Sequence, residues 1–457
     1  MRLLRGAMQG LSCGVMTVAV LMTIGCQDLT QDLPNGTVDP RTFRTPEGAV
    51  KLYHGVKHKF VQIDFAAQTG YLTDELQFQA VDVSAFFGEI PGGTDARNVI
   101  NTSGDVTNLY RRLHDTRNQI DQTIGMLGLF PDDTLRTYRG ELFALHGLVL
   151  TYLAEAFCSG VPLSRVDFDG DFTYVPGISR DSVLAVALAQ YDSAAVYAGS
   201  DSLLPRMIAA GRARTWMQRD SVRIAASYAA KVSPGFRYEL PSIVTVRPEY
   251  RVSDREGLNG VPYRSNGDPR SAVTFARLAG AGTSDTFFYV QKIASAATPV
   301  RVMSAIEAAL IVAEAALIEG QSAWLEQLNA LRTNGTFVVS GTDTVWNAGT
   351  GSVAGLRPLT DPGLDARPPG KTVFDVRLDL ILRERAYWLF LTGTRLGDLR
   401  RLVRHYRRPA DTVYPTGAYG RNGAAFNVRY GTDLVFPVPS SEQDLNPYYH
   451  GCFDLEA

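Results

Sequence analysis

Four arginines lie beside a run of large apolar side chains in residues 384–402, ERAYWLFLTGTRLGDLRRL. Clustered arginines could bind nucleic-acid phosphates, assist acid–base chemistry or pair with buried carboxylates. A DNA-reading helix would present its arginines on a polar face, whereas Arg385 lies on an apolar stripe with Leu378 and Leu389. The net charge of −2 also disfavours a protein that neutralises many phosphates. We expect no nucleic-acid partner and interpret these arginines as framework residues.

Glu307 and Glu314 lie seven residues apart in the apolar segment VMSAIEAALIVAEAALIEG and so share one face of a predicted helix. A carboxylate pair could serve as general acid and base or bind a metal ion. However, a helix that is apolar on nearly all faces is buried, and buried glutamates require cationic partners. The arginines of residues 384–402 can supply those partners, which favours ion pairing over catalysis.

Arg395, Asp398 and Arg401 follow one another at a spacing of three residues, which favours pairing along one helix face. The leucines between them form an apolar stripe on the opposite face. The residues predicted to form structural ion pairs are Glu307, Glu314, Arg385, Arg395 and Asp398.

Sequence patterns typical of enzymes are missing. The chain has six histidines, none in the HExxH spacing of zinc peptidases, and no GxSxG elbow. His54 and His58 are four residues apart on a predicted helix, but three lysines surround them, which favours a solvated face. We therefore predict no catalytic residue, no metal and no cofactor.

The first residues resemble a bacterial export signal. Two arginines precede a short apolar stretch that ends at Gly25-Cys26. A cysteine directly after the small residue resembles a lipobox, although Thr23 stands where Leu is usual. We predict a lipoprotein signal over residues 1–25, acylation of Cys26 and a lipidated tether over residues 26–44. The alternative is an ordinary signal peptide with an incidental cysteine.

Two cysteines, Cys158 and Cys452, remain after the signal and the acylated residue are set aside. An even number of cysteines in an exported protein indicates a disulfide. The alternative is a pair of separate buried thiols.

Helical periodicity dominates the rest of the chain, and we predict a mainly α fold built from paired helices that resemble tetratricopeptide hairpins. We predict one domain over residues 45–457. Its helical core covers about 45–235 and 300–405, loop insertions with short strands cover about 236–300 and 335–372, and an irregular tail covers 406–457. Helices are expected at about 45–66, 104–127, 132–158, 180–197, 204–217, 219–230, 301–319, 322–333 and 373–391.

Six motifs along the chain, taken in order, resemble the SusD/RagB family of outer-membrane nutrient-binding lipoproteins. They are GYLTDEL at 70–76, Arg117-Asn118, the Ala-rich helix that ends in GVPL at 160–163, IEAALIVAEA at 306–315, RERAYWLFLTGTRLGDLRR at 383–401, and FPVP followed by Asn446-Pro447. Each motif alone is weak, but their order behind a lipobox supports the resemblance. It covers essentially the whole mature chain.

The resemblance implies a lipid-anchored protein at the cell surface of the outer membrane, with a tetratricopeptide-like helical scaffold. Such proteins lie as a lid over a SusC-like TonB-dependent β-barrel transporter and bind its substrate, commonly an oligosaccharide and sometimes a peptide. They are not enzymes. The Cys158/Cys452 pair is not a general feature of the family, and the chain is shorter than usual.

A sugar site would need aromatic faces beside amides and carboxylates. The predicted ligand-binding residues are Phe86, Phe87, Asp74, Glu75, Gln79 and Trp346. For each of them the alternative is local packing, and Asp74 and Glu75 could equally fix a loop. Two other functions stay open: a helical scaffold that binds peptides or envelope proteins, and a helical glycoside hydrolase, for which no pair of loop carboxylates is evident.

Overall fold

The structure is a computed structural model. It describes residues 43–77, 93–168, 170–199, 203–242, 252–253, 259–271, 273–277, 286–290, 299–333, 335–340, 343–348, 356–419 and 429–457. For the strands at 273–277, 286–290, 335–340 and 343–348 only the backbone is described. The predicted signal peptide, Cys26 and nearly all of the tether lie outside the described residues.

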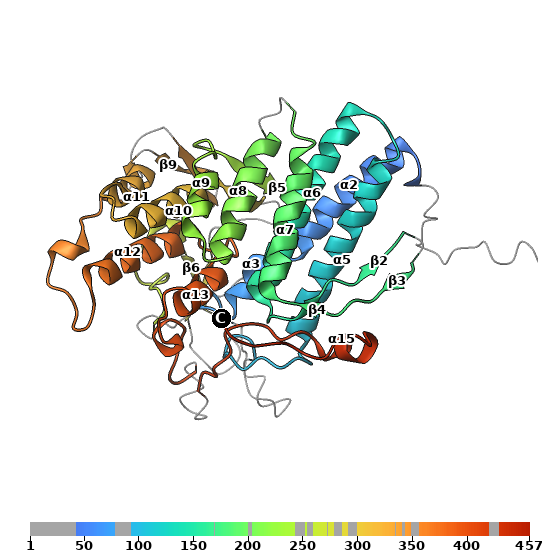
Figure 1. Cartoon of the computed structure of the whole chain (residues 1–457). Helices are drawn as coiled ribbons and strands as arrows, with labels where there is room; N and C mark the ends of the chain where they lie inside the picture. Colours follow the sequence, from blue (N-terminus) through green and yellow to red (C-terminus); the bar gives the residue numbers. More distant parts are fainter. Residues whose placement is uncertain are drawn as a thin grey trace, which may run out of the picture.

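The first half of the chain is a row of packed helices (Figure 1). Its elements are α2 (Pro46–Gln62), α3 (Phe65–Gly70), α5 (Gly104–Leu127), α6 (Asp133–Ala156), β1 (Val161–Pro162), β2 (Arg165–Val166), β3 (Phe172–Thr173), β4 (Gly177–Ile178), α7 (Arg180–Ala195), α8 (Leu203–Gln218) and α9 (Val222–Ala229). Helix α6 lies at the centre, because it packs against α5, α7 and α8.

The second half mixes helices with two-stranded sheets. Its elements are β5 (Arg237–Leu240), η2 (Pro269–Ser271), β6 (Val273–Arg277), β7 (Thr286–Val290), β8 (Val300–Ser304), α10 (Ala305–Ile318), α11 (Ala323–Thr333), β9 (Gly335–Ser340), β10 (Asp343–Ala348), η3 (Pro362–Leu364), α12 (Val373–Trp388), α13 (Arg395–Arg404), η4 (Ala410–Thr412) and α15 (Ser440–Leu445). The antiparallel strand pairs are β1–β4, β2–β3, β5–β8, β6–β7 and β9–β10. The predicted mainly helical, hairpin-based architecture is confirmed.

Side-chain caps determine where several helices begin. The Thr45 hydroxyl accepts a hydrogen bond from the backbone N–H of Gly48 (3.0 Å), and Pro46 occupies the first helical position, where its missing N–H costs nothing. Helix α12 begins with a reciprocal capping box between Thr372 and Asp375. Polar residues that precede apolar helical runs therefore fix these boundaries.

One predicted helix begins later than expected. The sequence predicts a helix from about residue 301, but Val300–Ser304 forms β8, which pairs with β5. The Ser304 side chain then accepts the N–H of Glu307 and caps α10. Two β-branched valines in β8 favour the extended backbone, and an apolar run this short has no periodicity that distinguishes strand from helix.

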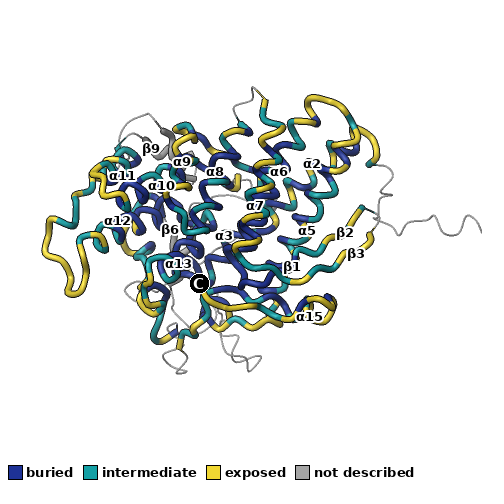
Figure 2. Tube along the Cα trace, viewed as in Figure 1, coloured by how far each residue is buried: buried dark blue, intermediate teal, exposed yellow. Residues whose placement is uncertain are grey.

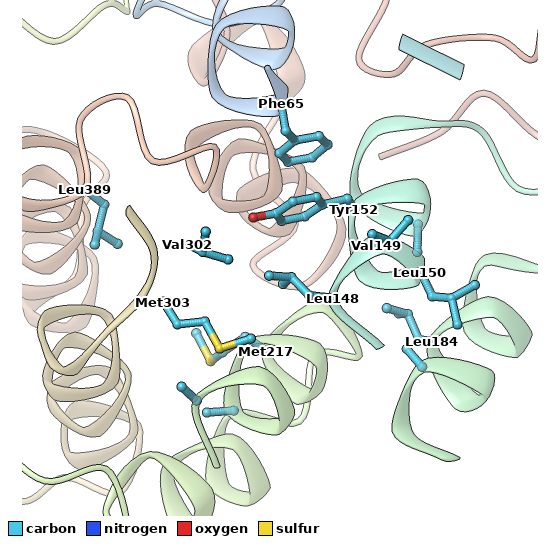
Figure 3. Packing of buried hydrophobic residues seen from close by; sticks show 14 of the residues in the cluster. Phe65, Leu148, Val149, Leu150, Tyr152, Leu184, Met217, Val302, Met303 and Leu389 are labelled. Carbon is cyan, nitrogen blue, oxygen red and sulfur yellow. The ribbon is translucent and has the colours of Figure 1, made fainter. Parts of the chain in front are cut away.

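Buried apolar side chains from both halves form one large cluster (Figure 2). In its centre the ring of Phe65, from α3, stacks on Tyr152, from α6, with ring centroids 3.9 Å apart (Figure 3). Helices α6, α7 and α8 approach closely around Tyr191, since a Cβ atom at Gly147 would lie 2.8 Å from its ring. Only glycine fits that contact.

The C-terminal tail packs back along the end of α6. Cys158 and Cys452 form a disulfide that joins positions 294 residues apart in the sequence. Backbone hydrogen bonds from Phe436 N to Ala156 O (2.9 Å) and from Phe453 N to Ser159 O (2.8 Å) align the tail with the same segment. The tail is thus held both covalently and by backbone pairing.

The Arg400 side chain caps the C-terminal end of α6. Its guanidinium is 2% exposed and donates to the carbonyl oxygens of Ala154 (2.9 Å) and Glu155 (2.7 Å), and at longer range to that of Glu456. The last carbonyls of a helix have no partner within the helix. A residue of α13 therefore satisfies the end of the central helix and contacts the tail at the same time.

Candidate ligand-binding surface

Asp74 lies just after α3 and is 1% exposed. Its two carboxylate oxygens accept hydrogen bonds from Arg395 Nε and Nη2, both at 2.7 Å, and Oδ2 also accepts Val261 N at 2.8 Å. Burial alone would lower the pKa of Arg395, but the Asp74 carboxylate raises it above its ordinary value. The Asp74 carboxylate therefore takes part in structural hydrogen bonds and is not accessible to a ligand, contrary to the prediction.

Glu75 is also 1% exposed. Its Oε1 accepts the N–H of Leu391 (3.1 Å), and its carbonyl accepts Ser253 N (3.0 Å). Leu391 has a φ of 53°, an uncommon left-handed conformation for a leucine, so this bond supports a strained turn after α12. The ligand-binding role predicted for Glu75 is likewise replaced by the alternative of fixing loop geometry.

Other contacts join segments that are far apart in sequence. Leu76 pairs with Val252, the Tyr419 hydroxyl donates to Asp95 Oδ2 (2.6 Å), and Gly431 N donates to Ala96 O (2.8 Å). We call residues 74–76, 94–97, 252–253 and 419 the junction. The described chain enters segments 78–92, 254–258 and 420–428 from positions at or next to the junction.

The side chains of the other predicted ligand-binding residues lie outside the described part of the structure. Gln79, Phe86 and Phe87 lie in segment 78–92, outside the described residues, and the described chain borders that segment at Gln77 and Gly93. Trp346 lies in β10, opposite Phe337 of β9, where only the backbone is described.

Most of the predicted ion-pair residues meet between α10, α12 and α13. Arg385 binds both oxygens of Asp398 (2.9 and 2.8 Å), while Arg401 binds Glu314 and also lies 3.4 Å from Asp398. Arg395 does not join this group as the spacing-three ladder suggested, because its partner is Asp74.

Glu307 differs from the prediction. It is half-buried and makes no ion pair within the described part of the chain. It lies in the first turn of α10, where solvent and the positive end of the helix dipole stabilise a carboxylate. Its charge still raises the pKa of the buried Arg214, in addition to the larger contribution of Glu155.

Glu155 and Glu384 are among the buried carboxylates that sequence reasoning missed. Glu155 accepts two hydrogen bonds from Arg214 (2.8 and 2.6 Å), and Glu384 accepts bonds from Arg270 (2.6 Å) and Arg332 (2.7 Å). Both glutamates lie on otherwise apolar helix faces. Such a position indicates that each glutamate pairs with a buried cation, but the sequence does not identify that cation. These carboxylates have arginine partners, as expected of structural ion pairs.

A second surface feature lies on the flank of the molecule, between α5 and the β2–β3 hairpin. It is a hollow of about 720 Å³, which we call the side groove. Its lining residues are Arg44, Asp121, Gln122, Gly125, Met126, Leu129, Arg165, Val166, Asp167, Phe168 and Thr173. The hairpin lies beside α5 in Figure 1.

The part of the chain that the structure describes lacks two other features. No group of three or more His, Cys, Asp or Glu side chains is arranged to hold a metal ion. Within the same residues, no helix has both the length and the apolar character needed to cross a lipid bilayer.

Solved structures with the same architecture are numerous, although the sequence is far from them. No family model matches the sequence, and no curated protein matches it. A SusD-like protein from Bacteroides fragilis is similar with a TM-score of 0.60 and 11% identity, over 91% of this chain and 98% of that one. The chain has the SusD-like fold.

Two other similar structures carry names that describe a ligand. Surface glycan-binding protein A from Bacteroides uniformis aligns with a TM-score of 0.58 and 13% identity, over 89% of this chain and 99% of that one. A SusD-like carbohydrate binding protein from Bacteroides fragilis aligns with a TM-score of 0.55 and 15% identity, also over 89% and 99%. The likeness covers 89% of this chain and 99% of each of these two neighbours.

Proposed function

We propose that this protein is a surface lipoprotein that binds a glycan and delivers it to a SusC-like TonB-dependent transporter. The observation that carries the proposal is the SusD-like fold over about nine-tenths of the chain, shared with proteins named for glycan or carbohydrate binding. The lipobox-like Cys26 supports attachment to the outer membrane at the cell surface. Binding makes and breaks no covalent bond, so the proposed role needs neither catalytic residue nor cofactor.

The junction supports a site in the loops around it. A buried ion pair with Arg395 holds Asp74, a hydrogen bond from the Leu391 N–H holds Glu75, and these residues precede segment 78–92. In the proposal, the aromatic faces of Phe86, Phe87 and Trp346 stack on sugar rings, and the Gln79 amide bonds to hydroxyl groups. Asp74 and Glu75 serve this site indirectly, by fixing the base of the loop.

Affinity electrophoresis of the whole protein in gels that contain starch, xylan, mannan or β-glucan tests the glycan role. We expect at least one polysaccharide to retard the wild type, and the double substitution Phe86→Ala, Phe87→Ala to weaken that retardation about tenfold or more. A stacked aromatic ring contributes about 0.5–1.5 kcal/mol beyond the area that it buries, and about 1.4 kcal/mol corresponds to a tenfold change in affinity.

Phe374→Ala is the matched control, because Phe374 is a phenylalanine that is 38% exposed on α12. It should leave the retardation unchanged. If no polysaccharide retards the wild type while an unfolded peptide mixture binds it, the glycan role is rejected and the peptide-binding scaffold takes its place.

Delivery to a transporter requires a separate measurement. We expect a large TonB-dependent barrel to co-purify in near-equal amount when the protein is pulled down from outer membranes of its source bacterium. Cys26→Ser, which removes the acylated thiol, should leave the protein out of the membrane fraction. Absence of a barrel from the wild-type pull-down would reject delivery without affecting glycan binding.

A further inference from the structure

The walls of the side groove are fixed in place. The amide of Gln122 on α5 donates to the carbonyl oxygens of Val166 (3.0 Å) and Asp167 (2.8 Å) in the β2–β3 hairpin. Asp171 N donates to Asp167 Oδ1 (2.9 Å), which closes the hairpin turn. Since these bonds hold the hairpin against the helix, the hollow is preformed and a ligand need not order its walls.

The lining of the groove combines apolar and polar groups. Met126 is buried, and the side chain of Leu129 is 62% exposed beside it. Two guanidinium groups, Arg44 and Arg165, lie around the same hollow as two carboxylates, which leaves the lining without net charge. A balanced lining does not favour a polyanion or a polycation.

One of those carboxylates, Asp121, stays ionised. Burial would raise its pKa, but His146, whose Nδ1 lies 3.1 Å from Asp121 Oδ1, and the nearby Arg117 lower the pKa below its ordinary value. A fixed carboxylate beside an amide and a guanidinium provides both acceptors and donors for hydroxyl groups. Phe168 and Leu129 provide surfaces against which the C–H face of a sugar ring can pack.

The geometry points to the side groove as a second sugar-binding subsite, which takes one or two uncharged sugar rings. Its volume of about 720 Å³ lies within the usual range for small-ligand sites. This inference rests on the proposed glycan function, and it adds a location that is separate from the junction.

Helix α5 separates the two places. The Thr94 hydroxyl of the junction bonds to Asp105 Oδ2 at the start of α5 (3.2 Å), whereas Gln122 contacts the groove near its end. Gln122 follows Asp105 by seventeen positions, which corresponds to about 25 Å along the helix at about 1.5 Å per residue. A glycan that contacts both places must therefore be polymeric, and occupying both raises its avidity.

Gly125 gives a sharp test of the groove. It lies on an exposed turn of α5 and lines the hollow, and a Cβ atom there would meet nothing within 4 Å. Gly125→Trp fills the hollow with a large side chain, whereas Gly125→Ala adds only a methyl group. Both substitutions remove a glycine from a helix interior, so neither is expected to weaken α5.

The measurement is saturation-transfer NMR on the whole protein with maltose, cellobiose, xylobiose and mannobiose as probes, and with glycylglycine as a non-sugar control. We expect transfer to at least one disaccharide from the wild type and equally from Gly125→Ala, and a signal at least threefold weaker from Gly125→Trp. Equal signals from the two variants would overturn the subsite. So would no transfer to any disaccharide, or equal transfer to glycylglycine.

The results that would reject the subsite differ from those that would reject the proposed function. Polysaccharide retardation that depends on Phe86 and Phe87 but not on Gly125 would keep the glycan role and reject the subsite. A disaccharide signal that Gly125→Trp removes, in a protein that no polysaccharide retards, would keep the groove as a sugar site and reject the wider role.

Discussion

Arg385, Asp398, Arg401 and Glu314 bring two cations and two carboxylates together at exposures of 4% or less. Removing such groups from water is costly, and their mutual attraction offsets the cost only when every charge has a partner. The Tyr406 hydroxyl adds a hydrogen bond to Glu314 Oε1 (2.6 Å). The group therefore behaves as one unit, in which the loss of any one member leaves a buried charge.

Arg401→Met tests this unit. We expect the free energy of unfolding to fall by about 3–5 kcal/mol, because Glu314 is left buried without a cation. The measurement is urea-induced unfolding at neutral pH. The double substitution Arg401→Met, Glu314→Leu removes both charges and should recover most of the loss. A loss below about 1 kcal/mol in the single variant would mean that the charges are not coupled in this way.

The sequence indicates which residues are charged within apolar surroundings but does not identify all of their partners. Arg385 and Glu314 stand out because their neighbours are apolar, and both were predicted to pair. Arg395 was assigned to the Asp398 ladder because the two share a helix face, yet its partner is Asp74, 321 positions away in sequence. Only the folded chain brings those two residues together.

At the scale of elements, the end of α8 depends on α13. Asp220 follows α8 with a φ of 57°, and its N–H bonds to Met217 O (3.0 Å), as at a left-handed helix end. Both oxygens of Asp220 accept bonds from Arg404 (2.7 and 2.9 Å), which also donates to the carbonyl of Gln218. One side chain of α13 thus satisfies the helix end and its charged neighbour.

Asp220→Asn should show a pH-dependent loss of stability. Burial alone would raise the pKa of Asp220, but the hydrogen bonds from Arg404 lower it below its ordinary value of 3.8. The stabilisation is therefore fully present above the ordinary pKa and is lost as pH falls through the lower, folded value. Asparagine tolerates the left-handed conformation, so the substitution changes mainly the charge.

Urea unfolding of both proteins at about pH 7 and about pH 3 measures this effect. We expect the variant to be less stable by about 1–2 kcal/mol at the higher pH, and the difference to shrink at the lower pH. Hydrogen bonds to a charged group contribute about 1.5–3 kcal/mol, and solvent screening reduces this for a partly exposed pair. A difference that is the same at both pH values would exclude the carboxylate charge as its cause.

Helix positions could be predicted closely where caps and periodicity agree. Residues 104–127 are helical as predicted, because Ser103 caps the helix and the apolar residues keep a helical spacing throughout. The prediction was wrong at residues 301–304, where pairing with β5 decides in favour of a strand. Between α12 and α13, Gly393 has a φ of 76°, which glycine adopts readily.

At the scale of the whole molecule, the disulfide between Cys158 and Cys452 joins the central helix to the tail. Cys158 is 1% exposed, and the tail beside it is also held by the bond from Phe453 N to Ser159 O. The link closes a loop of 294 residues, and a constraint on so long a loop removes much of the freedom of the unfolded chain. The covalent bond should therefore contribute to stability throughout the fold.

Cys452→Ser should lower the free energy of unfolding by about 2–5 kcal/mol and make the last residues accessible to protease. The double substitution Cys158→Ser, Cys452→Ser should be no less stable than the single one, because both lack the same bond. Chemical unfolding and limited proteolysis check these expectations. A tail that remains resistant in Cys452→Ser would mean that backbone pairing alone holds it.

The guanidinium of Arg400 at the end of α6 has a consequence for biosynthesis. The carbonyl of Glu155 receives its hydrogen bond from a residue that is added 245 positions later. A ribosome that stops early therefore releases a product whose central helix has a frayed end and whose apolar faces lack their covering elements. Such fragments offer quality-control proteases an unprotected site. The contact therefore forms only in a chain that has been synthesised at least as far as α13.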